Sequence, residues 1–386
     1  MKKLILLIFL GFIAIGVKAQ NNDFKSSKTQ FMIRGYGHMG YESIKTNGNT
    51  ESTYDGGSFS PIFMFKHSDR LMFESELEFE INEGTLEIGF EYADIMYVLN
   101  DYMTIRGGKF LLPFGTFMER LHPSWVNRMP TKPLGFGHDG IAPGSGVGVE
   151  LRGAFRMGTS TVNYSFYNTN GPAIKTPNGV EPAEAGMLAF NNLIDNNNST
   201  AFGGRIGLLP FANNSTEVGF SFYSTDKVGA TGSPYENLGA NLYALDFSFV
   251  KQLPSLGGTF DIKSQYNNSK IDNIVYTVEE DPGVFEDLNF DNQSHSFYAQ
   301  ISYRPTMSGD KFLKNLEFVY RYSEVRTPEG SGFESNKQES AFGLNYWISW
   351  RSLIKLNYQS ITGEGGHDVI GSFDQKGVFL HWAIGF

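Results

Sequence analysis

The sequence contains no cysteine among its 386 residues. This absence excludes disulfide bonds, thiolate metal sites and cysteine nucleophiles at once. Long apolar runs are also absent after Val17, and the mean hydropathy is -0.26. The sequence therefore predicts no membrane-spanning helix in the rest of the chain, and its stability must come from burial or from a closed sheet.

Positive charge is scarce. Lys and Arg together number 31 against 41 Asp and Glu, which gives a formal net charge of -10 at pH 7. Such acidity disfavours nucleic acid as a partner, and it disfavours docking on an anionic membrane surface. We therefore expect no nucleic acid among the partners of this protein.

Residues 1–19 have the pattern of an export signal. Two lysines precede an apolar run that ends at Val17, and Ala19 offers a small residue for cleavage before Gln20. The apolar run is too short for a spanning helix, which needs about 20 residues. We expect residues 1–19 to be removed, residues 20–30 to form a short N-terminal segment and residues 31–386 to form a single domain.

Aromatic residues are plentiful. Phe, Tyr and Trp make up 15% of the chain, Gly occurs 44 times, and charged residues account for only 19%. Many aromatics and glycines with few charges and no apolar helix are typical of a transmembrane β-barrel, in which alternation dilutes the apolar residues.

Two neighbouring segments alternate between apolar and acidic residues. The first pairs an apolar phase of Leu71, Phe73, Leu77, Phe79 and Ile81 with an acidic phase of Glu74, Glu76, Glu78 and Glu80. The second pairs Leu86, Ile88, Phe90 and Tyr92 with Glu87 and Glu91. Charges that face lipid are costly, so we expect all six glutamates to face water. A solvated face of a soluble sheet would show the same alternation.

Comparable segments recur as far as the C-terminus. They predict about sixteen strands, an even number that is typical of single-chain bacterial barrels. The connections alternate between long and short, and the first long one is expected from Ser43 to Gly57. A soluble sandwich has no reason to sort its loops in this way. The fold class that we predict is all-β: a transmembrane, antiparallel, up-and-down β-barrel.

One connection is much longer than a hairpin turn and is rich in proline and glycine. It follows a strand that begins at Tyr102, occupies about residues 111–146, and ends where the strand pattern resumes at Val147. Structureless inserts of this length within compact domains are usually functional or disordered. The insert carries side chains that a loop folded into a barrel mouth would use, namely Glu119, Arg120, His122, Trp125, Arg128, Lys132, His138 and Asp139.

A short motif at the start of this insert suggests a family. Gly108-Lys109-Phe110 followed by Pro113-Phe114-Gly115 resembles the outer-membrane porins of the phosphate-selective porin O/P type. The resemblance implies a sixteen-stranded, trimeric barrel in the outer membrane of a Gram-negative bacterium. It also implies that the third outer loop folds inward and narrows a pore lined by basic residues, through which small hydrophilic or charged solutes diffuse.

The candidate pore-lining residues carry both signs of charge. Acidic rings favour cations and rings of Arg or Lys favour anions, so the anion or phosphate preference stays open. Opposed acidic and basic walls would suit a general porin with a transverse field. Lys109 falls in the outward phase, so either Gly107-Gly108 forms a bulge there or the strand has already left the membrane. The pore-lining and constriction candidates are Arg106, Lys109, Glu119, Arg120, His122, Arg128, Lys132, Glu74, Glu76, Glu78, Glu80, Glu87, Glu91 and Arg152, and a partial basic wall would add Arg34, Arg156 and Arg205.

The final strand ends on an aromatic residue. Val378, Leu380, Trp382, Ile384 and Phe386 share one phase. This pattern looks like the insertion signal of outer-membrane barrels. We therefore expect the barrel assembly machinery to recognise Phe386 and outer-membrane lipids to surround the barrel.

Other functions have less support. The seven histidines show no helical His-Glu-x-x-His spacing, so no metal site and no cofactor are predicted. Gly35 to Gly40 matches the dinucleotide fingerprint by letter but lacks the strand before it and the helix after it. We predict a diffusion porin and not an enzyme. The alternatives are a narrow or plugged barrel that binds a surface partner or assists assembly, suggested by the loops 168–200 and 268–294, and a barrel enzyme that uses His138 and Asp139.

Overall fold

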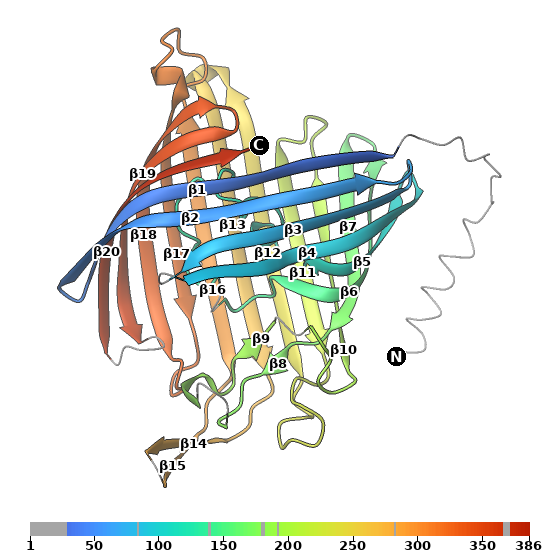
Figure 1. Cartoon of the computed structure of the whole chain (residues 1–386), viewed down its shortest axis with the longest axis vertical. Helices are drawn as coiled ribbons and strands as arrows, with labels where there is room; N and C mark the ends of the chain where they lie inside the picture. Colours follow the sequence, from blue (N-terminus) through green and yellow to red (C-terminus); the bar gives the residue numbers. More distant parts are fainter. Residues whose placement is uncertain are drawn as a thin grey trace.

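The computed structural model describes residues 29–82, 85–137, 140–178, 182–190, 193–281, 283–365 and 371–386. Its main feature is a closed antiparallel barrel of sixteen strands within those residues (Figure 1). The predicted export signal and the pair His138 and Asp139 lie outside the described residues. The barrel strands are β1 (Gln30–Thr46), β2 (Asn49–Lys66), β3 (Leu71–Asn82), β4 (Thr85–Asn100), β5 (Met103–Leu111), β6 (Ser145–Met157), β7 (Ser160–Asn170), β10 (Thr200–Leu209), β11 (Thr216–Thr225), β12 (Ala240–Leu253), β13 (Gly258–Ile271), β16 (Gln293–Arg304), β17 (Leu316–Arg326), β18 (Ser335–Ser349), β19 (Ser352–Gly365) and β20 (Ser372–Gly385).

Each barrel strand pairs with the next one along the chain, and β1 closes the ring against β20. Closure leaves no sheet edge with unpaired backbone groups, which is the requirement for a sheet surrounded by hydrocarbon. The predicted fold class, an all-β antiparallel up-and-down barrel, is confirmed. None of the helices in the described part of the chain is long and apolar enough to cross a membrane.

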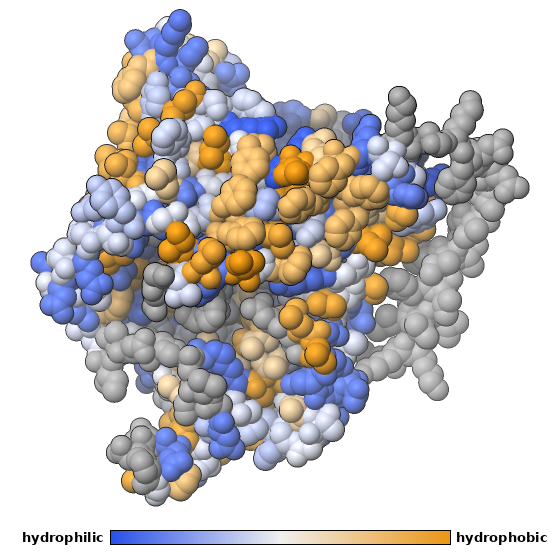
Figure 2. Space-filling model, in the orientation of Figure 1, coloured by the Kyte–Doolittle hydropathy of each residue, from blue (hydrophilic) through white to orange (hydrophobic). Residues whose placement is uncertain are grey.

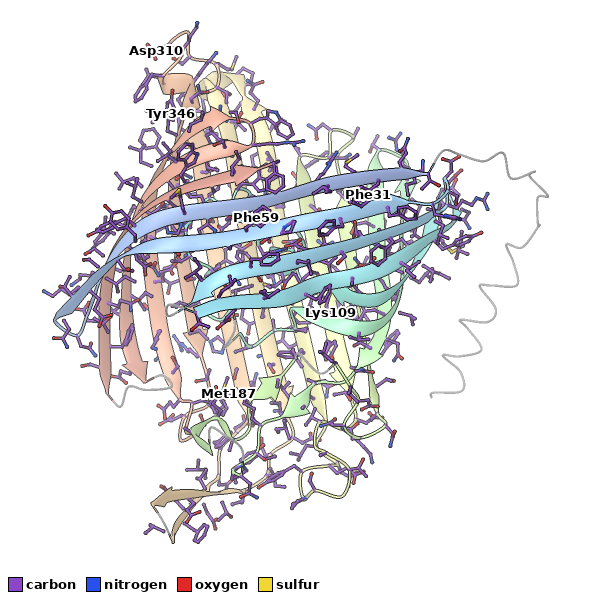
Figure 3. All side chains as sticks on the ribbon, in the orientation of Figure 1. Phe31, Phe59, Lys109, Met187, Asp310 and Tyr346 are labelled. Carbon is purple, nitrogen blue, oxygen red and sulfur yellow. The ribbon has the colours of Figure 1, made fainter. Side chains whose placement is uncertain are left out.

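The strand period of two sorts side chains between the two faces of the wall. Along β20, Leu380 and Trp382 are 48% and 51% exposed, whereas His381 and Ala383 between them are 6% and 0% exposed. The exposed residues point outward and the buried ones point into the barrel. Phe31 and Phe59 mark the outer face of β1 and β2 in Figure 3, and Figure 2 shows apolar side chains gathered across the face formed by β1–β4.

The longest connections lie at one rim of the barrel, marked by Met187 in Figure 3, and Asp310 marks the opposite rim. The long-loop rim carries the small sheets β8 (Ala173–Ile174) with β9 (Leu188–Ala189), and β14 (Tyr276–Asp281) with β15 (Val284–Leu288). The opposite rim carries shorter connections, two of which contain a 3-10 turn, η3 (Pro254–Leu256) and η4 (Leu313–Asn315).

The prediction of a loop from Ser43 to Gly57 is wrong. β1 and β2 form one long hairpin through most of that range, joined by a two-residue turn at Asn47-Gly48. Both turn residues have positive φ, 47° and 97°, as the tight hairpin turns that match strand twist require. An Asn-Gly pair adopts this geometry readily, so the chain reverses without a loop.

A bulge corrects the predicted phase of β4. Glu76 of β3 pairs with Tyr92, but Leu77 pairs with Phe90, so Glu91 is an extra residue. The bulge reverses the phase of everything after it. Tyr92, predicted to face outward, therefore lies on the same face as Glu76, and the following Asp94 is almost fully buried inside the barrel.

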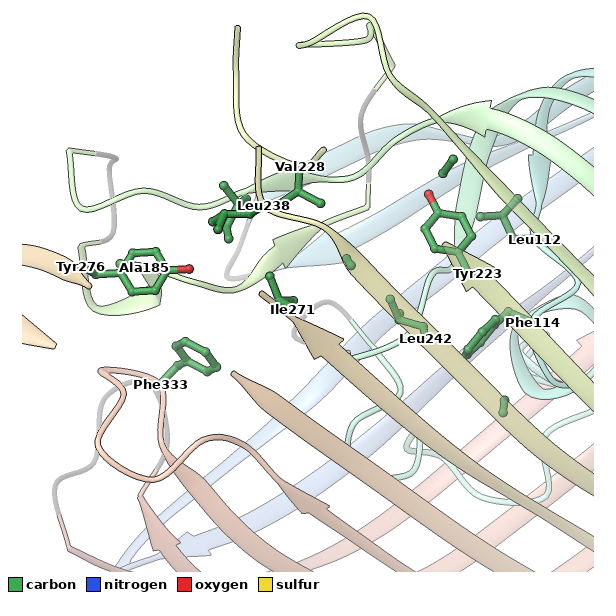
Figure 4. Close-up of a cluster of buried hydrophobic side chains, with 14 of the residues drawn as sticks. Leu112, Phe114, Ala185, Tyr223, Val228, Leu238, Leu242, Ile271, Tyr276 and Phe333 are labelled. Carbon is green, nitrogen blue, oxygen red and sulfur yellow. The ribbon is translucent and has the colours of Figure 1, made fainter. Parts of the chain in front are cut away.

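A buried apolar cluster joins the barrel wall to the loops at the long-loop rim (Figure 4). Phe114 and Leu112, from the long insert, pack with Tyr223 and Leu242 of the wall, and the cluster continues to Tyr276 in the β14–β15 hairpin. The loops at this rim therefore have a core of their own and cover part of the barrel mouth.

Candidate functional site

The described residues of the β5–β6 loop, 112–137 and 140–144, pack against side chains that point into the barrel. The first part of the loop is fixed to the wall by three backbone N–H groups: Gly115 donates to Ser221 Oγ at 2.9 Å, and Thr116 and Phe117 donate to Gln265 Oε1 at 2.9 and 3.0 Å. Ser221 belongs to β11 and Gln265 to β13. One buried glutamine therefore satisfies two loop donors that would otherwise lack partners.

The later part of the loop is bound to strands farther around the barrel. Lys355 of β19 donates to the carbonyl of Ser124 at 2.6 Å, and Arg321 of β17 donates to the carbonyl of Thr131 at 2.7 Å. The N–H of Leu134 donates to Ser323 Oγ at 3.1 Å. The loop thus leaves the wall at β5 and is anchored from β11 to β19, so it spans the lumen.

Gly115 is needed where the loop meets β13. Its φ is +66°, and a Cβ atom there would lie 2.0 Å from the side-chain amide of Gln265. Any other residue would combine a strained backbone with a clash. The Pro113-Phe114-Gly115 motif singled out in the sequence is therefore the point at which the loop docks.

A chain of ion pairs begins beside the loop. Arg106 Nε lies 2.6 Å from Glu150 Oε2, and Arg106 also faces Asp94 at 3.8 Å. Arg152 Nη2 lies 2.7 Å from Glu119 Oε1 in η1 (Phe117–Leu121), a short helical turn of the loop, and Arg152 Nε lies 3.6 Å from Glu150 Oε1. Arginines and carboxylates from the barrel wall and from the loop thus alternate in one connected set of ion pairs.

The same chain of ion pairs continues around the barrel through Arg120. Its Nη1 lies 2.9 Å from Glu217 Oε2 on β11, and Glu217 also pairs with Arg205 at 2.9 Å. Arg205 pairs in turn with Asp246 of β12 at 2.7 Å. The carboxylates on β11 and β12 therefore match arginines of both loop and wall.

Glu119 stands between three arginines. Burial alone would raise the pKa of its carboxyl, but the neighbouring Arg152, Arg120 and Arg106 outweigh burial and hold the pKa below its ordinary value. Glu119 is therefore ionised throughout the neutral range, and it keeps the loop attached to β6.

Arg128 forms a second charged centre. Its Nε lies 3.1 Å from Glu317 Oε1 of β17, its Nη2 lies 3.7 Å from Asp261 of β13, and its guanidinium stacks 4.8 Å from the ring centroid of Trp347. These residues also line a cavity of about 250 Å³. Arg128 is thus positioned in the lumen by groups from three strands.

The six predicted glutamates do not share one environment. Glu76 is 1% exposed, accepts a hydrogen bond from Tyr36 at 2.6 Å and lies 3.8 Å from His122 of the loop. The expectation that Glu76 faces water is therefore wrong, because the docked loop buries it. The others keep some exposure: Glu74 near Arg106 and Arg152, Glu78 near Glu91, and Glu80 opposite Glu87.

Lys109 is not a lumen residue. The register on both sides of β5 is continuous from Thr104 to Lys109, so Gly107-Gly108 forms no bulge. Lys109 pairs with Ala93 and Val147 in the outward phase, and its ammonium donates to the carbonyl of Phe90. The pore-lining prediction for Lys109 is corrected by this register.

The expected opposition of an acidic wall and a basic wall is also corrected. Arg106 pairs with Glu150 on the adjacent strand, Arg152 pairs with Glu150 on its own strand, and Arg205 pairs with Glu217 on the adjacent strand. Arg34 and Arg156 lie exposed near strand ends and outside this chain of ion pairs. Lys132 is exposed on the loop, where its charge acts on Glu78. Positive and negative charges therefore alternate along the wall.

The sequence analysis did not identify the wall residues that contact the β5–β6 loop. The only signal that could have found them was their position on the inward-facing side of the strands. Glu217, for example, alternates with the outward Val218 and Phe220. It also missed a cluster of His38, Asp55 and His381, whose ligand atoms lie within 4.8 Å of one another. This is a group in the described residues that could hold a metal ion. The missed lumen partners are Ser221, Glu217, Asp246, Asp261, Gln265, Glu317, Arg321, Ser323, Glu339 and Lys355.

Solvent reaches the charged side chains inside the barrel. The side chains of Arg120, Arg152 and Arg128 are 39%, 33% and 21% exposed although they lie within the ring of strands. A dry core would exclude such groups or bury them completely. The geometry defines a polar, solvated interior narrowed by a charged loop.

Comparisons with protein-family models and with curated proteins find no match for this sequence. Solved structures do match its fold. The outer-membrane channel DcaP of Acinetobacter baumannii has a TM-score of 0.58 at 12% identity, covering 94% of this chain and 99% of that chain. The class that the fold defines is the porin-like barrel.

Two further structures support the same class. The anion-selective porin from Comamonas acidovorans has a TM-score of 0.54 at 13% identity, covering 93% of this chain and 100% of that chain. OprB of Pseudomonas putida has a TM-score of 0.54 at 9% identity, covering 93% and 94%. At such identities the likeness establishes the shared fold.

Proposed function

We propose that this protein is an outer-membrane porin through which small hydrophilic solutes diffuse passively. The observation that carries the proposal is the solvent exposure of Arg120, Arg128 and Arg152 within a closed barrel. A narrowing lined by charge in a solvated lumen is what selective diffusion requires. The structural neighbours DcaP, an outer-membrane channel, and the anion-selective porin from Comamonas acidovorans support this function by their shared fold.

The outer surface of the barrel supports a location in a membrane. Outward residues of β1–β4 and β20 are apolar and exposed, including Phe31, Ile88, Leu380 and Trp382. Such a band is stable only when hydrocarbon or a partner covers it. Together with the predicted export signal, it supports placement among the lipids of a Gram-negative outer membrane.

Ion preference is a finer part of the proposal. The resemblance to phosphate-selective porins implies basic pore residues, but the lumen arginines described here face carboxylates such as Glu150, Glu217 and Glu317. Glu78, Glu80 and Glu91 meanwhile lie close together on β3 and β4. We therefore infer a weak preference for cations over anions such as phosphate.

Conductance of purified protein in a planar bilayer tests the function. Stepwise conductance, together with a reversal potential in a salt gradient that indicates cation selectivity, supports both the porin function and the cation preference. A reversal potential of anion sign retains the porin and rejects the preference. Absence of steps from folded protein rejects the porin.

A plugged barrel is the second candidate, because the loop is anchored on strands from β11 to β19 and a rim cluster joins the outer loops. Such a barrel would bind a surface partner or assist assembly and would show no conductance. Trimer formation, which the resemblance implies, remains a prediction that chemical cross-linking in native membranes can check.

A further inference from the structure

The strands that close the barrel bring two histidines and a carboxylate together. His38 of β1 and His381 of β20 stack with ring centroids 5.3 Å apart. Asp55 Oδ2, on β2, lies 3.5 Å from His38 Nε2 and 3.8 Å from His381 Nε2. The three residues come from three adjacent strands and face the lumen.

The backbone makes room for this cluster. Gly40 of β1 pairs with Asp55 on one side and with His381 on the other. A Cβ atom on Gly40 would lie 2.4 Å from His381 Cδ2. Because Gly40 has no side chain, the imidazole lies flat against β1 and its Nε2 can point at Asp55.

The polar atoms of the cluster are arranged as metal ligands are. The N–H of Gly57 donates to Asp55 Oδ1 at 2.7 Å, which leaves Oδ2 directed at both imidazoles. Ser58 Oγ lies 3.1 Å from His38 Nδ1 and can accept a hydrogen bond from Nδ1–H, which leaves the Nε2 lone pair free for a metal ion. His381 Nε2 is buried and has no hydrogen-bond partner among the described residues. A buried polar atom left in this state is costly unless a ligand binds it.

The donor set identifies the class of cation. Two imidazole nitrogens and one carboxylate oxygen suit Zn²⁺ and its neighbours in the first transition row, whereas Mg²⁺ and Ca²⁺ need more oxygen ligands. Bonds of about 2.0–2.2 Å in tetrahedral geometry place donor atoms about 3.3–3.5 Å apart. The two nitrogen–oxygen separations of 3.5 and 3.8 Å are close to this value, and the three ligand atoms, which lie within 4.8 Å of one another, would move closer together when an ion binds.

We propose that His38, Asp55 and His381 bind a divalent transition-metal ion of the zinc class, which clamps the seam of the barrel. β1 and β20 meet there without a hairpin to join them, since they are the two ends of the ring. A bound ion would link the two strands and retain at least one coordination position toward the lumen. This inference is independent of what the pore conducts.

Zinc binding to the intact barrel tests the site. The full chain, purified in detergent and treated with EDTA, is titrated with Zn²⁺ in a calorimeter, and Co²⁺ serves as the spectroscopic probe. We expect one ion per chain and a Co²⁺ absorption spectrum of a nitrogen- and oxygen-ligated site. His38→Ala and Asp55→Asn should abolish both signals, and His67→Ala, in an exposed turn, should leave them unchanged.

Two further variants separate ligation from folding. Gly40→Ala keeps all three ligands but displaces the His381 ring, so it should weaken binding. Ser58→Ala should weaken it on the order of tenfold by releasing the orientation of His38. Saturating Zn²⁺ should also raise the unfolding midpoint of the unmodified protein and not that of Asp55→Asn, because binding to the folded state stabilises it. No stoichiometric uptake by the unmodified protein, or uptake unaffected by loss of His38 and Asp55, overturns the proposal.

Discussion

At the scale of single residues, each arginine of the inserted loop is held by a carboxylate from a distant strand. Arg120 contacts Glu217, 97 residues away, and Arg128 contacts Glu317, 189 residues away. Partly exposed pairs of this kind contribute little to stability individually. Their main effect is on the local potential, because each fixes the sign of charge at one point of the lumen.

Reversing one of these charges should change ion selectivity. Arg128→Glu places a third acid beside Glu317 and Asp261, so we expect the reversal potential in a salt gradient to move toward the cation limit. Arg120→Glu should move it in the same direction. Arg70→Glu, in the exposed β2–β3 turn, makes the same change in net charge and should have little effect. An unchanged potential in both loop variants would place the loop away from the narrowest point.

Glu119 gives the loop a pH dependence of defined sign. Its pKa in the folded protein is lower than in the unfolded chain, so its ionised form contributes stability at pH values above the unfolded pKa. That contribution falls as the pH decreases through the folded pKa. We expect conductance to stay constant from neutral pH to about 4.3, the ordinary pKa of glutamate, and the loop to loosen only in more acidic solution.

Conductance traces recorded at decreasing pH will check this expectation. Glu119→Gln lacks the ionised carboxylate and should show the loosened behaviour already at neutral pH. A change in the unmodified protein that is complete above the ordinary pKa of glutamate would contradict the argument.

At the scale of elements, the docking of the loop depends on Gln265 of β13. Replacing it by alanine leaves the N–H groups of Thr116 and Phe117 without their acceptor, at a cost of about 1–3 kcal/mol for each buried group. We expect Gln265→Ala to raise single-channel conductance and noise and to expose the loop to limited proteolysis. Gln252→Ala, on the exposed rim, is the matched control. A protected loop with unchanged conductance would mean that Gln265 is dispensable.

The sequence was sufficient to predict a barrel of about sixteen strands, because most of them carry a period of two, although it misplaced the end of β1 and the start of β2. It also contained the Asn47-Gly48 turn, which is a recognisable hairpin signal. The bulge at Glu91 could not be predicted, since one extra residue changes the phase without changing the composition. The contacts of the loop were equally inaccessible, because strand alternation says which face a residue occupies but not which residue stands across the lumen.

At the scale of the whole molecule, the ring is closed by β1 and β20, and Phe386 completes that seam. Its N–H donates to the carbonyl of Gly35 at 2.9 Å, its carbonyl accepts from Gly35 at 3.2 Å, and its ring stacks on Phe59 with centroids 5.8 Å apart. The terminal residue is therefore part of the barrel wall. Recognition of the same residue by an assembly factor remains a prediction.

Two versions of the end of the chain separate these roles. Phe386→Ala keeps both backbone hydrogen bonds, so refolding of this variant in detergent should be nearly unimpaired. If an assembly factor recognises the ring, the amount of the variant in the outer membrane should fall several-fold. Deletion of Phe386 removes the bonds as well and should impair both. Heat-dependent mobility on gels reports the folded fraction, and Phe312→Ala, an exposed aromatic in a turn, is the control. An unchanged amount of the Phe386→Ala variant in the outer membrane would show that no assembly factor recognises the ring.

The anchors of the inserted loop also impose an order on how the molecule is made. Arg128 and Thr131 have their partners on β17, and Ser124 has its partner on β19, more than a hundred residues downstream in the chain. While the C-terminal strands are still missing, only the first part of the loop, which docks on β11 and β13, has its partners. The later part of the loop therefore reaches its final position only after β17 and β19 are in place.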